Sequence, residues 1–355
     1  MMTAVFLSHC EKDEPEPEVH LPDDWGLIKD EKFLNALIER GVDTNGDSII
    51  AYAEAEAVRT LNLADCGISD MSGIELFSNL QSLYCNDNQL TDLDVSYNTA
   101  LEVLYCNDNQ LKRLLVSGDT ALLYLYCFNN QLTTLDVSNN TFLKILYCYN
   151  NQLTTLGVSN NSALESLNCY WNRLISLNVS NNYALIELTC YNNQLTTLNV
   201  SNNSALKTLS CSSNHLTTLD VSNNSALDYL NCQHNQFTTL HVANNTALVW
   251  LYCADNQLTT LDVSSNVFLK ILYCSRNRLT TLDVSNNTAL DRLSCHSNQL
   301  TSLDISSNTA LSYLVLNYMP SLYKVCVWEM PFPPAGVEVN TTGSPNVYFT
   351  TDCSK

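Results

Sequence analysis

The sequence predicts a repeat solenoid, with short parallel strands on two sides of each turn and a small α-helical cap at the N-terminal end. Eleven of the fifteen cysteines lie 21 residues apart, from Cys85 to Cys295. An Asn follows each of them three residues later, from Asn88 to Asn298, and Leu residues lie two and five positions before each. A fixed period of this kind indicates one structural unit stacked on copies of itself.

Each period contains two similar halves. The pattern L-x-x-L-x-C-x-x-N, as in residues 164–172, is followed by L-x-x-L-x-V-x-x-N, as in residues 174–182. Alternation predicts that Leu, Cys and Val point inward from two strands on opposite sides of a flattened coil. The Asn amides are expected to bond backbone groups at the corners, which would otherwise be buried without partners.

The pattern L-x-x-L-x-C-x-x-N-x-L resembles the leucine-rich repeat. Its nested halves of 10 and 11 residues resemble a bacterial 21-residue subclass called IRREKO, and the resemblance covers residues 80–316. The resemblance implies a parallel, curved or flattened solenoid, and a use mostly in protein or glycan recognition. Residues 59–79 form a repeat of a different type, an adaptor that resembles the first turns of internalin-like proteins.

The flanks are predicted to close the solenoid. Apolar residues at helical spacing predict a helical cap over residues 21–58. Residues 317–355 are predicted to be a C-terminal cap, in which residues 331–334 (Pro-Phe-Pro-Pro) stop regular structure. Cys326 and Cys353 flank this cap, so a disulfide between them is an option if the protein is exported.

Residues 1–20 are interpreted as a signal remnant followed by an acidic tether. Leu7-Ser8-His9-Cys10 resembles a bacterial lipobox, which implies lipidation of Cys10 and export to the outer-membrane surface. The alternative is a disordered acidic tail. The sequence has no run of 18 apolar residues, so membrane contact is expected only through a lipid anchor.

Charge and motifs exclude several classes of function. The formal net charge of -20 would repel a phosphate backbone, so we expect no nucleic-acid partner. No phosphate-binding loop, nucleophile elbow or dinucleotide fingerprint occurs, and we predict a monomeric binding protein rather than an enzyme. Thiols on parallel strands cannot converge on zinc, and their Cβ atoms would lie about 4.8 Å apart, beyond the usual ~3.8 Å of a disulfide. Free thiols acting as small apolar groups are expected.

Residues 43–54 match the 12-residue EF-hand loop, which implies a weak calcium site. Side-chain oxygens, one backbone carbonyl and a bidentate carboxylate would bind the ion. In order, these ligands are Asp43, Asn45, Asp47, Ile49 and Glu54. Ser48 stands where the loop favours Gly. The alternative is a polar turn between two cap helices.

Aromatic residues recur at outward positions beside the Cys strand. One column contains Tyr84, Tyr105, Tyr126 and Tyr147, and its neighbour contains Phe128, Tyr149, Tyr170 and Tyr191. More aromatic residues recur in the C-terminal half: Tyr229, Trp250, Tyr252 and Tyr273. The columns either stabilise the sheet by cross-strand stacking or form a recognition surface.

We predict a non-catalytic binding or adhesion solenoid whose two aromatic columns bind a protein or glycan at the cell surface. The alternative is an architectural spacer without a specific ligand. The opposite face carries a column of aspartates, such as Asp136 and Asp220, which we interpret as a solvated face.

Overall fold

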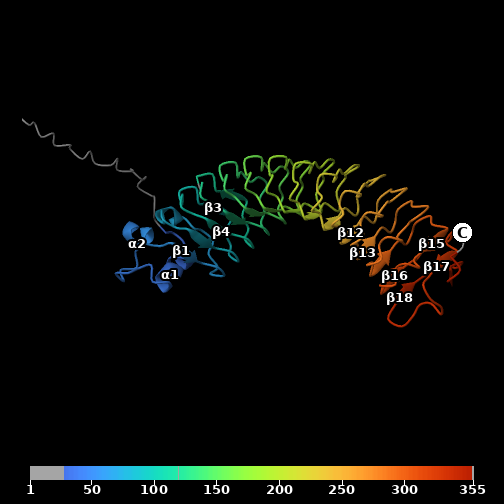
Figure 1. Cartoon of the computed structure of the whole chain (residues 1–355). Helices are drawn as coiled ribbons and strands as arrows, with labels where there is room; N and C mark the ends of the chain where they lie inside the picture. The colour runs from blue at the N-terminus through green and yellow to red at the C-terminus, as the bar shows by residue number, and fades with distance from the viewer. Residues whose placement is uncertain (1–27, 119, 354–355) are drawn as a thin grey trace, which may run out of the picture.

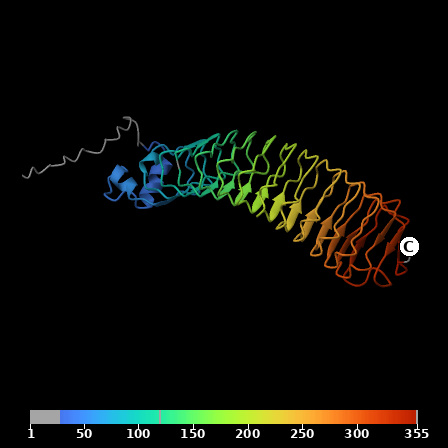
Figure 2. The same ribbon diagram turned by 45° about the horizontal axis from the view of Figure 1, so that its top comes forward.

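The computed structural model describes residues 28–118 and 120–353, and in these residues the chain forms a curved solenoid (Figures 1 and 2). The predictions for Cys10 and for residues 1–27 in general lie outside the described residues, as does Asp119. Within the described ranges, no helix has the length and apolar character needed to cross a bilayer.

A helical cap covers the N-terminal end, as predicted. Helix α1 (Glu31–Glu39) begins at Asp30, whose carboxylate accepts hydrogen bonds from the backbone N–H groups of Lys32 and Phe33. Such capping satisfies donors that the first helical turn leaves unpaired. Phe33 and Leu37 are four residues apart, share one face of α1 and are fully buried. Helix α2 (Tyr52–Glu56) begins within the last three residues of the EF-hand-like loop.

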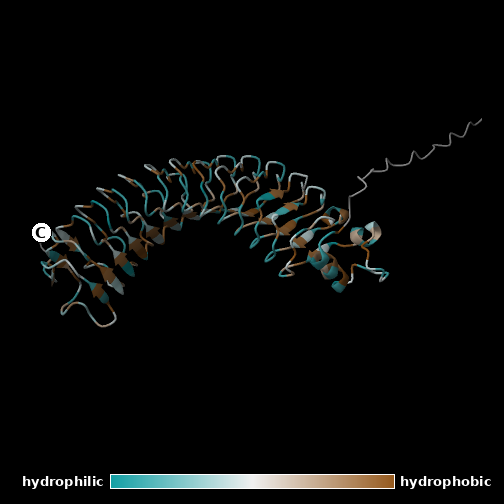
Figure 3. Cartoon of the chain, turned by 180° about the vertical axis from the view of Figure 1, so that it is seen from behind, coloured by the Kyte–Doolittle hydropathy of each residue, from teal (hydrophilic) through white to brown (hydrophobic). Residues whose placement is uncertain are grey.

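The main sheet has fourteen parallel strands and lines the concave side of the arc (Figure 1). Each strand pairs with the next at the same position of the repeat, as where Leu167 faces Leu188. Figure 3 shows predominantly hydrophobic residues along many of these strands. In sheet order the strands are β1 (Thr60–Asn62), β2 (Ser82–Tyr84), β4 (Val103–Tyr105), β6 (Tyr124–Tyr126), β7 (Ile145–Tyr147), β8 (Ser166–Asn168), β9 (Glu187–Thr189), β10 (Thr208–Ser210), β11 (Tyr229–Asn231), β12 (Trp250–Tyr252), β13 (Ile271–Tyr273), β14 (Arg292–Ser294), β16 (Tyr313–Val315) and β18 (Glu338–Asn340).

The second side of the coil differs from the expectation of a strand in every turn. Regular pairing occurs near the two ends, where β3 (Asp92–Asp94) pairs with β5 (Arg113–Leu115), and β15 (Ser302–Asp304), β17 (Lys324–Cys326) and β19 (Tyr348–Thr350) form a second sheet. Between them the described residues contain only isolated bridges, such as Asp136 to Gly157. Because the turns fan apart on the convex side of an arc, continuous pairing at about 4.8 Å is harder to maintain there.

The core consists of the predicted Leu, Cys and Val columns. All eleven cysteines of the 21-residue series are free thiols with no exposed surface. Burial raises the pKa of the Cys85 thiol to about 12 and raises the pKa of Cys169 well above its ordinary value. The interpretation of these thiols as small apolar core groups is therefore confirmed.

The first Asn column forms the predicted ladder. The side chain of Asn193 accepts a hydrogen bond from the Leu174 N–H at 2.9 Å and donates to the carbonyls of Cys169 and Cys190, each at 3.1 Å. One amide thus joins its own turn to the preceding turn. The second column also bridges turns, but both acceptors lie in the preceding turn: Asn203 Nδ2 donates to the carbonyls of Val179 and Asn182 at 3.0 and 2.8 Å.

Three features of the corners were not predicted. The residue two positions after each Cys has a left-handed backbone, with φ between 50° and 56° from Asp87 to Ser297. An exposed third column of Asn also bridges turns, as in Asn202, which donates to the Ser180 carbonyl at 3.0 Å. The aspartates of the opposite face do more than solvate it, because Asp136 accepts a hydrogen bond from the Ser138 N–H at 2.9 Å. These carboxylates close the corner turn.

The C-terminal segment continues the coil. Strands β17, β18 and β19 add two further turns, and β19 pairs in parallel with β17. The predicted cap over residues 317–355 is thus a pair of irregular turns.

Candidate binding face

The first aromatic column lies on the concave face. Tyr84, Tyr105, Tyr126 and Tyr147 end four successive strands, each paired in register with the next. The ring centroids of neighbouring members are 5.2, 4.1 and 5.2 Å apart, and the last pair is edge-on at 85°. All four side chains are half-buried. The predicted juxtaposition of these residues is therefore correct.

The second column is more regular. Phe128, Tyr149, Tyr170 and Tyr191 stack with centroid separations of 4.4, 4.4 and 4.3 Å and interplanar angles of 9°, 10° and 8°. Both faces of Tyr149 and of Tyr170 are consequently covered by neighbouring rings. The column presents ring edges and hydroxyl groups to the solvent.

Three tyrosines of the columns, Tyr126, Tyr149 and Tyr191, have raised pKa values. Burial, with charge and hydrogen-bonding effects of Tyr170, raises the pKa of Tyr149 and of Tyr191 to about 12. Burial and the neighbouring Tyr105 also raise the pKa of Tyr126. At neutral pH each hydroxyl can both donate and accept a hydrogen bond.

Trp171 stands at the corner beside the second column. Its ring is edge-on to Tyr170 at 80°, it is 52 % exposed, and its backbone is left-handed with φ of 50°. A bulky residue in this backbone region carries a strain of roughly 1–3 kcal/mol, and the same backbone recurs at this position from Asp87 to Ser297, so it belongs to the corner turn of the repeat. A polar edge adjoins the columns, where the Asp108 carboxylate accepts hydrogen bonds from Asn107 and Asn129, each at 2.7 Å.

The EF-hand-like loop has many internal hydrogen bonds. Asp43 accepts from the N–H groups of Gly46 and Ser48, and Ser48 has a left-handed backbone with φ of 62° despite its side chain. Glu54 accepts from the Ala51 N–H, the Thr44 hydroxyl and the Thr44 N–H. These bonds lower the pKa of Glu54 to about 2. In the described part of the chain, the carboxylate oxygens of Asp43, Asp47 and Glu54 do not all lie within 4.8 Å of one another.

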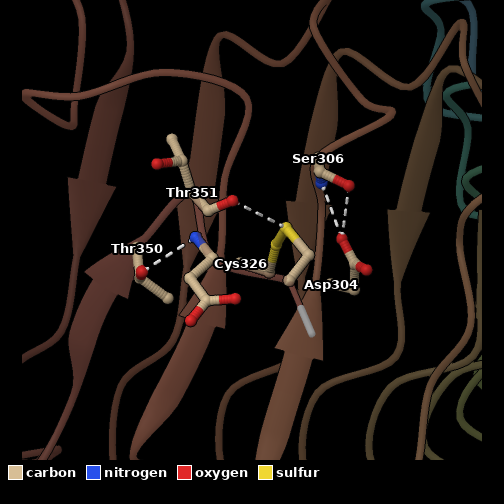
Figure 4. Close-up of a disulfide and its surroundings, with 7 residues drawn as sticks. Asp304, Ser306, Cys326, Thr350 and Thr351 are labelled. Atoms are coloured by element: carbon tan, nitrogen blue, oxygen red, sulfur yellow. Dashed lines mark hydrogen bonds between the residues drawn. A yellow bond between two sulfur atoms is a disulfide. The ribbon is translucent and has the colours of Figure 1, made fainter. Parts of the chain in front are cut away.

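Cys326 and Cys353 form a disulfide, with their Cα atoms 5.5 Å apart (Figure 4). It joins β17 to the chain that follows β19. The Asp304 carboxylate lies within 4.8 Å of both sulfur atoms and accepts hydrogen bonds from the N–H and hydroxyl of Ser306. The disulfide therefore holds the last described residues against the final turn.

Comparisons with known proteins agree with the repeat pattern. The profile of "Leucine Rich repeats (2 copies)" matches residues 56–98 and 78–117, and that of the LVIVD repeat matches residues 112–151. The structure is similar to the functional domain of InlJ from Listeria monocytogenes, whose description includes a cysteine ladder. The two are 36 % identical with a TM-score of 0.70, over 79 % of this chain and 66 % of that domain. The chain is a bacterial leucine-rich-repeat protein.

Two further structures are similar to this one. A leucine-rich-repeat protein from Leptospira interrogans, LIC12759, is 26 % identical, with a TM-score of 0.66 over 76 % of this chain and 74 % of the other. The internalin InlF from Listeria monocytogenes, at 23 % identity and a TM-score of 0.72 over 87 % and 94 % of the two chains, shows the shared fold. No curated protein matches the sequence. This leucine-rich-repeat protein spans 66 % of the length of the InlJ domain.

Proposed function

We propose that this leucine-rich-repeat protein is a non-catalytic binding or adhesion protein whose concave aromatic columns bind a protein or glycan at the cell surface. The observation that carries the proposal is the alignment of eight aromatic residues on adjacent concave strands and corners. Aromatic residues provide large contact areas at low entropic cost, and they are enriched at interfaces.

Between the two ligand classes, the ring geometry favours a protein for these columns. A sugar packs its apolar face on the flat face of an aromatic ring. The flat faces of Tyr149 and Tyr170 are already covered by their stacked neighbours. A protein loop can instead use ring edges and hydroxyls, together with the polar edge around Asp108.

Replacing Tyr126, Tyr147, Tyr149 and Tyr170 together by Ser is expected to weaken ligand binding about 100-fold or more, because buried aromatic contacts dominate interface energies. Protein and glycan arrays, followed by titration of the best ligand, measure the effect. The matched control is Thr189→Ala with Ser210→Ala, which lie in the strands beyond the first column.

The control should bind like the native protein. Circular dichroism should show that both variants fold, because the Leu and Cys core is unchanged. If the quadruple variant unfolds, the rings are structural and the alternative of an architectural spacer is favoured.

We also propose that the protein is exported as an outer-membrane lipoprotein through acylation of Cys10. The lipobox-like residues 7–10 and the acidic stretch after them support this. Changing Cys10 to Ala should move the protein from the membrane fraction to the soluble fraction after cell fractionation. A native protein that is already soluble in the cytoplasm would refute the anchor.

Calcium binding by residues 43–54 is a further proposal. The ligand types fit a calcium ion, and the Asp43 hydrogen bonds hold the loop in a closed turn. Glu54 would have to exchange its bonds with Thr44 and Ala51 for the ion. With a dissociation constant of ~10⁻⁴ to 10⁻³ M, 5 mM calcium would stabilise the cap by about 1–2 kcal/mol.

The melting temperature of the cap should therefore be higher in millimolar calcium than in chelator. Glu54→Gln should remove this difference, whereas Glu56→Gln, in the same helix but outside the loop, should retain it. Equal melting temperatures of the native protein in the two buffers would exclude the site.

A further inference from the structure

A hollow lies at the C-terminal end of the concave face. Its lining includes Tyr273 of β13, Arg292 of β14, Tyr313 of β16 and Glu338 of β18, with Gly336 and Val337 from the preceding loop. Figure 1 shows the chain near β16 and β18 extending past the concave edge of the sheet as a loop. The hollow thus has a floor of strands and a wall formed by the segment before β18.

The aromatic rings leading into this hollow differ from those of the second N-terminal column. Tyr229, Trp250, Tyr252 and Tyr273, which we name the C-terminal cluster, meet at interplanar angles of 45°, 52° and 87°. No pair in this cluster is stacked, among the ring contacts of the described residues. The residue that follows Tyr273 in the same column is Ser294, which is too small to cover a ring. In the part of the chain that the structure describes, no stacked ring covers the faces of these residues, in contrast to the covered faces of Tyr149 and Tyr170.

Polar groups of both kinds surround these rings. The Arg292 guanidinium lies over the Tyr313 ring, 5.9 Å from its centroid, and its Nε is 3.6 Å from the Asp291 carboxylate. Both partners of this ion pair are about half exposed, at 50 % and 44 %, so the pair is weak and open to competition from a ligand. Glu338 adds an exposed acceptor on β18.

This combination fits one ligand class. A neutral sugar ring presents an apolar C–H face and a rim of hydroxyls that both donate and accept hydrogen bonds. An aromatic face, a guanidinium donor and carboxylate acceptors match these groups in turn. An acidic sugar would meet two carboxylates, Asp291 and Glu338, against one guanidinium, in a protein with a net charge of -20.

We propose that the C-terminal hollow and the C-terminal cluster form a separate carbohydrate-binding site for a neutral pyranose of a glycan chain. Tyr273 supplies the stacking face, Arg292 donates to ring hydroxyls, and Glu338 accepts from them. The site is distinct from the N-terminal columns and does not depend on the ligand proposed for them.

The test titrates the full chain with three neutral hexasaccharides, built from glucose, mannose and N-acetylglucosamine, and with one acidic hexasaccharide of galacturonic acid. Calorimetry gives affinities, and saturation-transfer NMR detects the contacts. At least one neutral hexasaccharide is expected to bind saturably. Tyr273→Ala, Arg292→Ala and Glu338→Gln should each weaken binding by about tenfold or more.

Thr189→Ala is the matched control, because Thr189 occupies the same strand position as Tyr273 but belongs to neither the N-terminal columns nor the C-terminal cluster. It should leave sugar affinity unchanged. Glu338 is exposed on the last strand of its sheet, so Glu338→Gln tests the site without disturbing the core. Absence of saturable binding to every neutral hexasaccharide would overturn the proposal. So would tighter binding of the acidic one, or loss of sugar binding in a Tyr105→Ala variant of the N-terminal columns but not in the three site variants.

Discussion

The protein is expected to unfold steeply as the pH rises from about 9 to 11. Its eleven buried thiols have raised pKa values, to about 12 for Cys85, Cys127, Cys211 and Cys295 and upward for the others. In the unfolded chain a thiol titrates near pH 9. Above that pH the unfolded state releases protons that the folded state retains.

The direction of this pH dependence follows from the difference between the folded and unfolded pKa values. A pKa that is higher in the folded state gives stability that is fully present below the unfolded pKa and is lost as the pH rises toward the folded value. Each thiol contributes a slope of about 1.4 kcal/mol per pH unit, so eleven give about 15 kcal/mol per pH unit for complete unfolding. The raised pKa values of Tyr126, Tyr149 and Tyr191 act in the same direction at slightly higher pH.

Urea unfolding at intervals between pH 8 and pH 11, followed by circular dichroism, measures this slope. A variant with Cys148, Cys169 and Cys190 changed to Ala should have a lower free energy of unfolding at pH 8. Its free energy should fall less steeply with pH, because about three fewer protons are released on unfolding. A slope that is the same in the native protein and in this variant would contradict the thiol explanation.

Replacing Asn193 by Ala should destabilise the solenoid by about 3 kcal/mol or more, because buried groups left without hydrogen bonds cost about 1–3 kcal/mol each. The groups in question are the Leu174 N–H and the carbonyls of Cys169 and Cys190. Asn193 lies in the middle of the stack, so the loss affects two turns at once. Urea denaturation at neutral pH measures the free energy of unfolding.

Asn202→Ala is the control for this effect. Asn202 lies in the same region and also bridges two turns, but its side chain is exposed and donates a single hydrogen bond, to Ser180. Water can replace that partner, so we expect a loss below about 1 kcal/mol. Similar losses in the two variants would show that the buried amide ladder does not dominate the stability of the coil.

The sequence was sufficient to predict the concave half of the fold. The fixed period places Leu167 opposite Leu188 and Tyr149 next to Tyr170, because any other register would expose the Leu and Cys columns. The same logic predicted the bonds of Asn193, since a corner inside a coil leaves backbone groups in need of a partner.

The curvature of the solenoid, the orientation of the rings and the backbone of the corners could not be predicted from the spacing of residues. The curvature decides where pairing on the convex side is lost, as between Asn178 and Asp220, and periodicity does not reveal curvature. The orientation of rings depends on side-chain torsions, so the sequence alone could not distinguish stacked Tyr170 from edge-on Tyr273. Nothing in the sequence predicted the left-handed backbone at Trp171, because none of the equivalent positions in the 21-residue series is Gly.

The uniform register also makes the length of this protein adjustable in whole units. Because Glu187 pairs with Thr208 at the same repeat position at which Thr208 pairs with Tyr229, excision of one 21-residue unit would join equivalent strands and preserve every ladder. Such a deletion within residues 187–228 would bring the N-terminal columns and the C-terminal cluster closer by about 4.8 Å per unit. Duplication would separate them by the same step. Recombination between near-identical repeats can thus change the distance between the two surfaces while the fold stays the same. Selection can then act on this distance.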